Sequence, residues 1–200
     1  MLRVHHAEDG PADGPTVLLL HGEPTWGYLY RKMMPALAEE GIRSLVPDQV
    51  GFGRSDKPAD RGDYSYQRHV DWMQGWLNAT GPERLFFFGQ DWGGLIGLRL
   101  VATDPERFAG LVVSNTGLPD GSGKPNDAFM AWQRFSQTAE EFPIGRIITG
   151  GCLSELPPDV IDAYDAPFPD DTFKEGARIW PTLVPTSADD PAVPSNLAAW

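Results

Sequence analysis

One short segment constrains the fold of this chain more than any other. Residues 89–94 read GQDWGG; they follow the apolar run 84–88 and lead into the helix-like stretch Trp92–Thr103. Glycines two residues before and two residues after Asp91 permit the tight turn that lifts a central side chain above a sheet. This strand–turn–helix pattern has the frame of a nucleophile elbow, with Asp91 in the position of the nucleophile. The structural alternative is an aspartate that only caps the helix, but such a residue would not need both glycines.

The first 120 residues alternate apolar runs with amphipathic stretches. We predict strands at Thr16–Leu20, 42–46, 84–88 and 111–114, and helices between them at 28–40, 65–77 and Trp92–Thr103. The strands are near-continuous apolar runs, which is typical of strands covered on both faces. Their alternation with helices predicts βαβ units and a parallel central sheet with helices on both sides.

After residue 119 the pattern changes. Residues 119–127 (PDGSGKPND) indicate a loop, and 128–138 indicate a helix. Prolines then interrupt the chain repeatedly, so we expect short helices, with another helix beginning near residue 189. The interrupting prolines include those at positions 157, 158, 167, 169, 181 and 185.

Composition excludes several classes of protein. The chain has 16 Lys and Arg against 28 Asp and Glu, a net charge of −12, which repels phosphate backbones, so we expect no nucleic-acid partner. No apolar stretch approaches the roughly 18 residues of a membrane helix, and residues 1–10 lack the apolar region of a Sec-type signal. The single cysteine, Cys152, forms neither an internal disulfide nor a cysteine zinc site, which favours a reducing, cytoplasmic location. We expect this thiol to be buried or semi-buried and without a reactive role.

The aspartate in the elbow determines the chemistry. A carboxylate has an unperturbed pKa of about 3.9 and is already ionised at neutral pH, so it needs no base to act as a nucleophile. It suits attack on a carbon that carries a leaving group, which gives an alkyl–enzyme ester. Water activated by a general base must then hydrolyse that ester.

A second motif follows the first predicted strand. Residues 21–26 read HGEPTW and stand where an elbow enzyme draws the second donor of its oxyanion hole. We expect the backbone N–H groups of Glu23 and Trp92 to be the donors. His21 is best interpreted as a structural histidine that bonds loop backbone. The other histidines have no catalytic context and are expected on the surface or on helices; they are His5, His6 and His69.

Together these segments resemble haloalkane dehalogenases of the α/β-hydrolase superfamily. The matching segments are HGEPTWGYLYRK (21–32), PDQVGFGRSDKP (47–58), YSYQRHVDWM (64–73), GQDWGGLIGLRL (89–100), SNTGLP (114–119), AFMAWQRF (128–135) and YDAPFPDDTFKEGAR (164–178). The combination of HGEPTW and QDWGG is the specific part. The resemblance implies an α/β-hydrolase core over residues 1–120, a helical cap over 121–188, and the start of a return to the core over 189–200.

The resemblance also implies a halide site. Trp92 matches the family tryptophan whose indole N–H holds the departing halide, and a donor-only group suits a weakly basic anion. One subfamily has Asn at the position of Glu23; this chain resembles the other subfamily, whose second donor is a cap tryptophan, matched by Trp132. Further residues implied around the substrate cavity are Phe129, Phe135, Trp180 and Pro181. Val184 matches too but is better interpreted as a core residue, and Gln49 stands without explanation where an apolar residue is expected.

The acid and base of the family are not found in this chain. Asn115 stands where one subfamily places its catalytic acid, and an amide cannot serve as that carboxylate. In the other subfamily the acid and the histidine both follow the cap, but no histidine follows His69. The first strand of the family is also not recognised. We therefore expect a fragment truncated at the C-terminus and at the N-terminus.

The resemblance implies hydrolysis of small halogenated alkanes to alcohol and halide through an aspartyl ester, by a monomer that uses no metal or organic cofactor. One alternative is an epoxide hydrolase, which also uses an elbow aspartate but needs tyrosine acids from the cap. Tyr164 is the only tyrosine after Tyr66. The other alternative is a non-catalytic fragment that at most binds halide or small apolar ligands.

Overall fold

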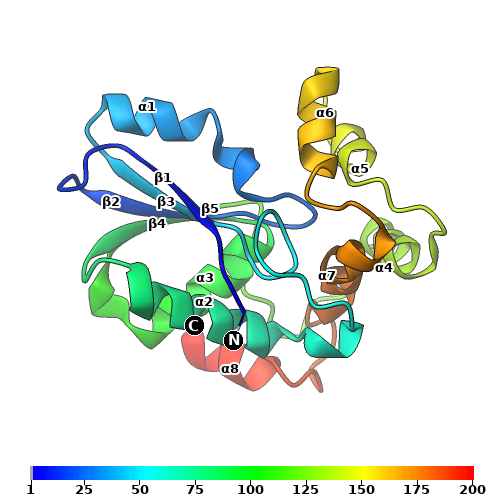
Figure 1. Ribbon diagram of the computed structural model, residues 1–200. Helices are drawn as coiled ribbons and strands as arrows, with labels where there is room; N and C mark the ends of the chain where they lie inside the picture. The colour runs from blue at the N-terminus through cyan, green and yellow to red at the C-terminus, as the bar shows by residue number, and fades with distance from the viewer. Residues whose placement is uncertain (1) are drawn as a thin grey trace.

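A five-stranded sheet organises the computed structural model, which describes residues 2–200 (Figure 1). The strands are β1 (His6–Asp9), β2 (Thr16–Leu20), β3 (Arg43–Pro47), β4 (Leu85–Gln90) and β5 (Phe108–Ser114). Their order is β1-β3-β2-β4-β5. Strands β3, β2, β4 and β5 are parallel, as predicted, whereas β1 runs antiparallel to β3 at one edge.

Strand β1 was not predicted, and it adds an antiparallel edge strand to the predicted parallel sheet. The strand reads HAED and is mostly half-exposed. An edge strand of this kind lacks the continuous apolar run by which a strand buried on both faces is recognised. The central strand β2 has that run, and its residues Leu18, Leu19 and Leu20 are fully buried.

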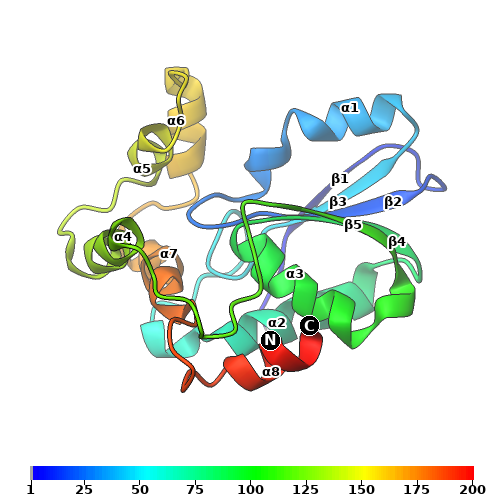
Figure 2. The same ribbon diagram turned by 180° about the vertical axis from the view of Figure 1, so that it is seen from behind.

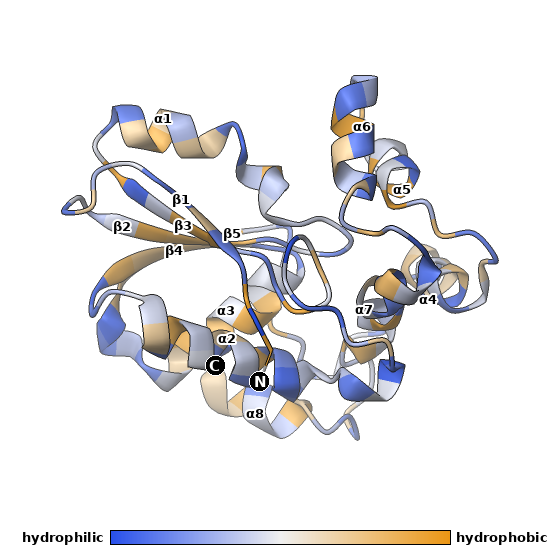
Figure 3. Ribbon diagram, viewed as in Figure 1, coloured by the Kyte–Doolittle hydropathy of each residue, from blue (hydrophilic) through white to orange (hydrophobic). Residues whose placement is uncertain are grey.

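Helices cover the two faces of the sheet. Helix α1 (Met33–Glu39) lies on one face, and α2 (Tyr66–Thr80) and α3 (Trp92–Thr103) lie on the other (Figures 1 and 2). The prediction for α3 is confirmed to the residue, and α2 begins where Ser65 accepts a hydrogen bond from the backbone N–H of Arg68. Figure 3 shows hydrophobic residues concentrated along the central strands.

The predicted helix 28–40 is instead two pieces. The structure has a 3-10 turn η1 (Gly27–Tyr30) followed by α1. Pro35 explains the division, because it has no N–H to donate to the carbonyl of residue 31. The helical hydrogen-bond ladder therefore cannot run without interruption through this segment.

Short helices beyond residue 119 stand beside the sheet. They are α4 (Asp127–Thr138), α5 (Ile144–Gly150), α6 (Pro158–Asp165), η4 (Asp171–Lys174), α7 (Glu175–Ile179), η5 (Trp180–Leu183) and α8 (Val193–Ala199). Helix α8 packs on α3, where Arg99 Nη1 donates to Asn196 Oδ1 at 3.1 Å. The division into core, cap and returning segment remains a prediction.

Two further observations concern properties expected from composition. Cys152 is exposed, against the expectation of a buried or semi-buried thiol, because it lies in the turn that follows α5. Within residues 2–200, no helix combines the length and apolar character needed to cross a membrane.

Candidate active site

The turn between β4 and α3 has the geometry of an elbow. Asp91 adopts φ 52° and ψ −126°, a left-handed conformation that is uncommon for residues other than glycine. A Cβ atom at Gly93 would lie 1.9 Å from the carbonyl oxygen of Leu20, and one at Gly22 would lie 2.4 Å from Asp91 Oδ1. Glycine at both positions is therefore what allows Asp91 to sit close against the end of β2.

The Asp91 carboxyl group is held by the 21–26 loop. The backbone N–H of Glu23 donates to Asp91 Oδ1 at 2.7 Å, and the hydroxyl group of Thr116 donates to the Asp91 carbonyl oxygen at 2.6 Å. Burial raises the pKa of Asp91 above its usual value, while hydrogen bonds from the backbone N–H groups of Glu23 and Trp92 lower it. The backbone N–H of Glu23, one of the two groups predicted to form the oxyanion hole, thus holds Asp91 Oδ1, and the backbone N–H of Trp92 also stabilises the carboxylate.

A cavity of about 290 Å3 opens above this carboxyl group. Its walls come from the elbow, from the 21–26 loop, from α4 and α5, and from η5 with the residues that follow it. The lining residues are Glu23, Pro24, Asp91, Trp92, Phe129, Trp132, Ile147, Pro181 and Val184. The volume suits a ligand of a few heavy atoms.

The structure brings most of the predicted site residues to this cavity. Phe129, Trp132 and Pro181 line it together with the elbow residues, and so does Val184, for which a core position was preferred. Ile147 was not named by the sequence analysis. It belongs to the short helix α5, whose sequence IGRIITG carries no motif that points to a ligand.

Two predicted cavity residues lie elsewhere. Phe135 is 42% exposed and stacks on the outer side of Trp132, with ring centroids 5.8 Å apart. Trp180 is fully buried behind Trp92, with ring centroids 5.0 Å apart, and its Nε1 donates to His69 Nε2 at 2.6 Å. Neither side chain reaches the cavity wall, although each supports a tryptophan that does.

His69 lies on a helix, one of the two placements expected for it, and it is buried in the core side of α2. Burial lowers its pKa to about 3, and the nearby His21 adds to this shift. The ring is neutral at ordinary pH and accepts the Trp180 hydrogen bond. Helical spacing alone cannot separate such a residue from one that faces solvent.

The structure gives His21 the predicted structural role and explains Gln49. His21 Nδ1 lies 3.1 Å from the carbonyl oxygen of Gly22, and His21 Nε2 accepts from the backbone N–H of Gln49 at 3.0 Å. Gln49 Nε2 in turn donates to the His21 carbonyl oxygen at 2.6 Å. Burial lowers the pKa of His21. An apolar residue at position 49 would leave this buried loop carbonyl without its donor.

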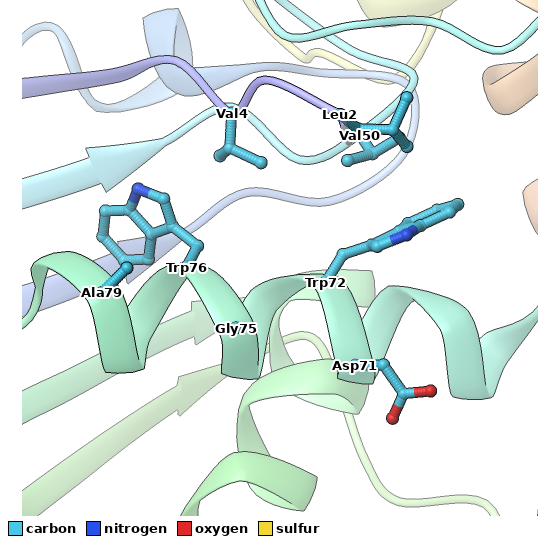
Figure 4. Close-up of a pocket in the computed structure, with 8 residues that line it drawn as sticks. All are labelled: Leu2, Val4, Val50, Asp71, Trp72, Gly75, Trp76 and Ala79. Carbon is cyan, nitrogen blue, oxygen red and sulfur yellow. The ribbon is translucent and has the colours of Figure 1, made fainter.

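A larger hollow of about 660 Å3 lies between the N-terminal segment and α2 (Figure 4). Leu2, Val4, Trp72 and Trp76 form much of its wall. Asp71 is the one ionisable residue in that wall, and no second polar side chain converges on it. The hollow therefore lacks a paired chemical group of the kind found at the elbow.

Within residues 2–200, no cluster of three or more His, Cys, Asp or Glu side chains could hold a metal ion. None of the histidines in this part of the chain lines the elbow cavity. The groups available there are the carboxyl groups of Asp91 and Glu23, backbone N–H donors and the indole groups of two tryptophans.

Comparison with known proteins defines the class first. A family model described as "alpha/beta hydrolase fold" matches residues 15–154, which include the 21–26 loop and the elbow. A curated haloalkane dehalogenase of Psychrobacter cryohalolentis is 55% identical over 199 residues, covering 100% of this chain and 66% of the relative. One of Mycobacterium marinum is 50% identical, covering 100% of this chain and 67% of the relative.

A solved structure agrees with these relatives. The tetrameric structure of a haloalkane dehalogenase from Paraglaciecola agarilytica superposes with a TM-score of 0.93 at 36% identity, covering 99% of this chain and 66% of that chain. The chain therefore belongs to the haloalkane dehalogenase family of the α/β hydrolases. It spans about two thirds of the length of the curated relatives it matches.

Proposed function

We propose that this chain carries the nucleophilic half of a haloalkane dehalogenase. The observation that supports the proposal is the placement of Asp91. Its carboxyl group stands on an elbow, with Oδ1 held by the backbone N–H of Glu23, in a small cavity that two tryptophans also line. The proposed substrates are small halogenated alkanes, and the proposed products are an alcohol and a halide ion.

The first step is an alkylation. Asp91 Oδ2 attacks the carbon that bears the halogen, a carbon–oxygen bond forms, and the carbon–halogen bond breaks with its electron pair going to the halide. We assign the indole N–H groups of Trp92 and Trp132 to that halide, because a donor-only group stabilises an anion without offering a competing lone pair. Asp91 Oδ1 remains on the Glu23 N–H throughout this step.

The second step is hydrolysis of the ester. Water attacks the carboxyl carbon of Asp91, and the negative charge develops on Oδ1, which the Glu23 N–H already holds. We assign the Trp92 N–H as the second donor to that charge. A base must take a proton from that water and pass a proton to the alkyl oxygen, formerly Oδ2. The bond between this oxygen and the Asp91 carboxyl carbon then breaks, and the alcohol leaves. His21 and His69 are both committed to buried hydrogen bonds and do not line the cavity. We therefore propose that this chain alone completes the first step and retains the ester.

Bromide release tests the proposal. The chain is incubated with 1,2-dibromoethane, and free bromide is measured per mole of protein. Because Cys152 is exposed and is itself a nucleophile, the measurement uses a Cys152→Ser background. We expect about one equivalent of bromide, since one Asp91 forms one ester. No release, or continued release over many equivalents, would count against the assignment.

The residues that line the cavity do not favour the epoxide hydrolase alternative. The hydroxyl group of Tyr164 accepts a hydrogen bond from Arg31 Nη1 at 3.3 Å, and Tyr164 is not among the lining residues. An epoxide hydrolase needs tyrosine acids over the cavity to protonate the epoxide oxygen, and no tyrosine of residues 2–200 lines it. The monomeric state stays a prediction; light scattering on the purified chain tests it.

A further inference from the structure

The side chain of Glu23 has no task in the chemistry described so far. Its backbone N–H holds Asp91, and its peptide bond to Pro24 is cis. Its carboxyl group, however, lies in the wall of the cavity, and Glu23 Oε1 is buried without a hydrogen-bond partner. A buried carboxylate without a partner is costly, so this group has a reason to be neutral.

The surroundings of the carboxyl group favour the neutral form. Burial raises the pKa of Glu23 well above its usual value, the charge of Asp91 raises it further, and a hydrogen bond from Trp132 lowers it. Asp91 is the one other ionisable residue that lines the cavity. His21, on the same loop, is engaged with Gln49, and neither α4 nor α5 contributes an ionisable residue to the lining.

A charged Glu23 side chain and a halide would compete for the same site. Glu23 and Trp132 line the same cavity, close enough for the Trp132 N–H to lower the pKa of the Glu23 carboxyl group, and this N–H is the second donor proposed for the halide. A charged Glu23 would hold that N–H more strongly and would repel any anion in a cavity of about 290 Å3. A neutral Glu23 does neither.

We propose that Glu23 controls the anion site through its ionisation: the neutral carboxyl group admits a halide, and the carboxylate takes the Trp132 N–H and excludes it. This inference rests on the proposed function only in taking a halide as the ligand. Bromide binding is then accompanied by uptake of one proton wherever Glu23 is ionised. Halide leaves more readily as the pH rises, which couples product release to loss of that proton.

The test is a set of bromide titrations, followed by tryptophan fluorescence, from about pH 5 to about pH 9. In the unmodified chain, the affinity is expected to be constant below the pKa of Glu23 and to fall by about tenfold per pH unit above it. The Glu23→Gln variant keeps a neutral side chain of the same shape. Its affinity is expected to match the low-pH value of the unmodified chain and to lose this dependence.

An Asp91→Asn variant separates the two carboxyl groups. The charge of Asp91 is one of the causes that raise the pKa of Glu23, so its removal is expected to shift the fall in affinity to lower pH without abolishing it. If Glu23→Gln retains the full pH dependence while Asp91→Asn loses it, the inference is wrong and Asp91 is the controlling group. If bromide binds at no pH, the halide site itself fails, and the proposed function fails with it.

A second measurement needs no variant. Linked equilibria are reciprocal, so bromide must raise the pKa of the group whose neutral form it prefers. The chain is labelled with 13C at its glutamate carboxyl carbons, and the buried carboxyl resonance is titrated with and without bromide. A bromide-dependent upward shift supports the inference. An unchanged titration in the presence of bound bromide overturns it.

Discussion

The two walls of the elbow cavity are built in different ways. One wall, the core wall, consists of the 21–26 loop and the elbow at residues 89–94. Backbone contacts hold it, because the Glu23 N–H donates to Asp91 Oδ1 and the close approach of Gly93 to Leu20 fixes the turn against β2. The wall beyond the sheet is built of side chains from short helices, and Phe129, Trp132 and Pro181 come from two separate elements. Backbone contacts tolerate little change, whereas side chains on short helices can be exchanged. We therefore expect the core wall to determine the reaction and the other wall to determine what binds.

Asp91→Asn changes the reactive group of the core wall, and its effect on the rate of alkylation is expected to be the largest. The amide keeps an oxygen that can accept the Glu23 N–H, so the fold is preserved, but it is not a nucleophile. Alkylation by 1,2-dibromoethane should slow by at least about 10³-fold. The rate of mass increase in the Cys152→Ser background measures this. Alkylation at an undiminished rate would remove Asp91 from its assigned role.

Gly93→Ala tests whether the turn depends on backbone approach. The added Cβ would meet the Leu20 carbonyl oxygen at 1.9 Å, so the free energy of unfolding should fall by about 3 kcal/mol. Gly75→Ala is the matched control, because it lies in α2 with nothing within 4 Å of the added atom. That change should raise the free energy of unfolding by about 1 kcal/mol. Urea unfolding measures both, and equal effects would contradict the account.

His69 tests the layer behind the cavity. Its pKa is about 3 when folded, below the value of about 6.5 for an unperturbed histidine. The unfolded chain therefore binds the proton first, and stability is lost as the pH falls below about 6.5. His69 alone should cost about 2 kcal/mol between about pH 7 and about pH 5.

The His69→Gln variant should show a shallower loss over this pH range. Some dependence will persist, because burial lowers the pKa of His21 as well. Urea unfolding at the two pH values gives the comparison. The same slope in the variant and the unmodified chain would show that His69 is not held neutral by the fold.

Trp132→Phe tests the wall beyond the sheet, with the smallest expected effect. An aromatic ring is kept but the N–H is lost, so bromide should bind about 10-fold more weakly, while urea unfolding is nearly unchanged. Trp72→Phe is the control, since Trp72 lines the separate hollow beside α2 (Figure 4). An unchanged bromide affinity in Trp132→Phe would assign the second donor elsewhere.

The sequence predicts the core wall better than the wall beyond the sheet. The pattern around Asp91 dictates both its conformation and its neighbours, because two glycines and a following helix leave the backbone few alternatives. Strand β1 was not predicted because its four residues, HAED, include three polar ones and carry no periodic apolar signal. Aromatic residues on the short helices could be recognised as candidate cavity residues. The sequence could not show which of them face the cavity. Phe129 and Phe135 lie on the same helix, yet one faces the cavity and the other is 42% exposed.

The sequence also could not show which polar side chains are buried. Nothing in the segment YSYQRHVDWM shows that His69 would meet Trp180, which lies 111 residues further along the chain. The role of Gln49 became clear only from the hydrogen bonds that it makes with His21 in the structure. Long-range hydrogen bonds of this kind depend on packing that no local pattern encodes.

The central claim is that Asp91 is a nucleophile poised by the core wall. Its most direct test is intact mass followed by peptide mapping of the Cys152→Ser chain after exposure to 1,2-dibromoethane. The account predicts a single bromoethyl group on the peptide that contains Asp91, still present after the reagent is removed. An unmodified Asp91, or a bromoethyl group found only on other residues, would contradict it.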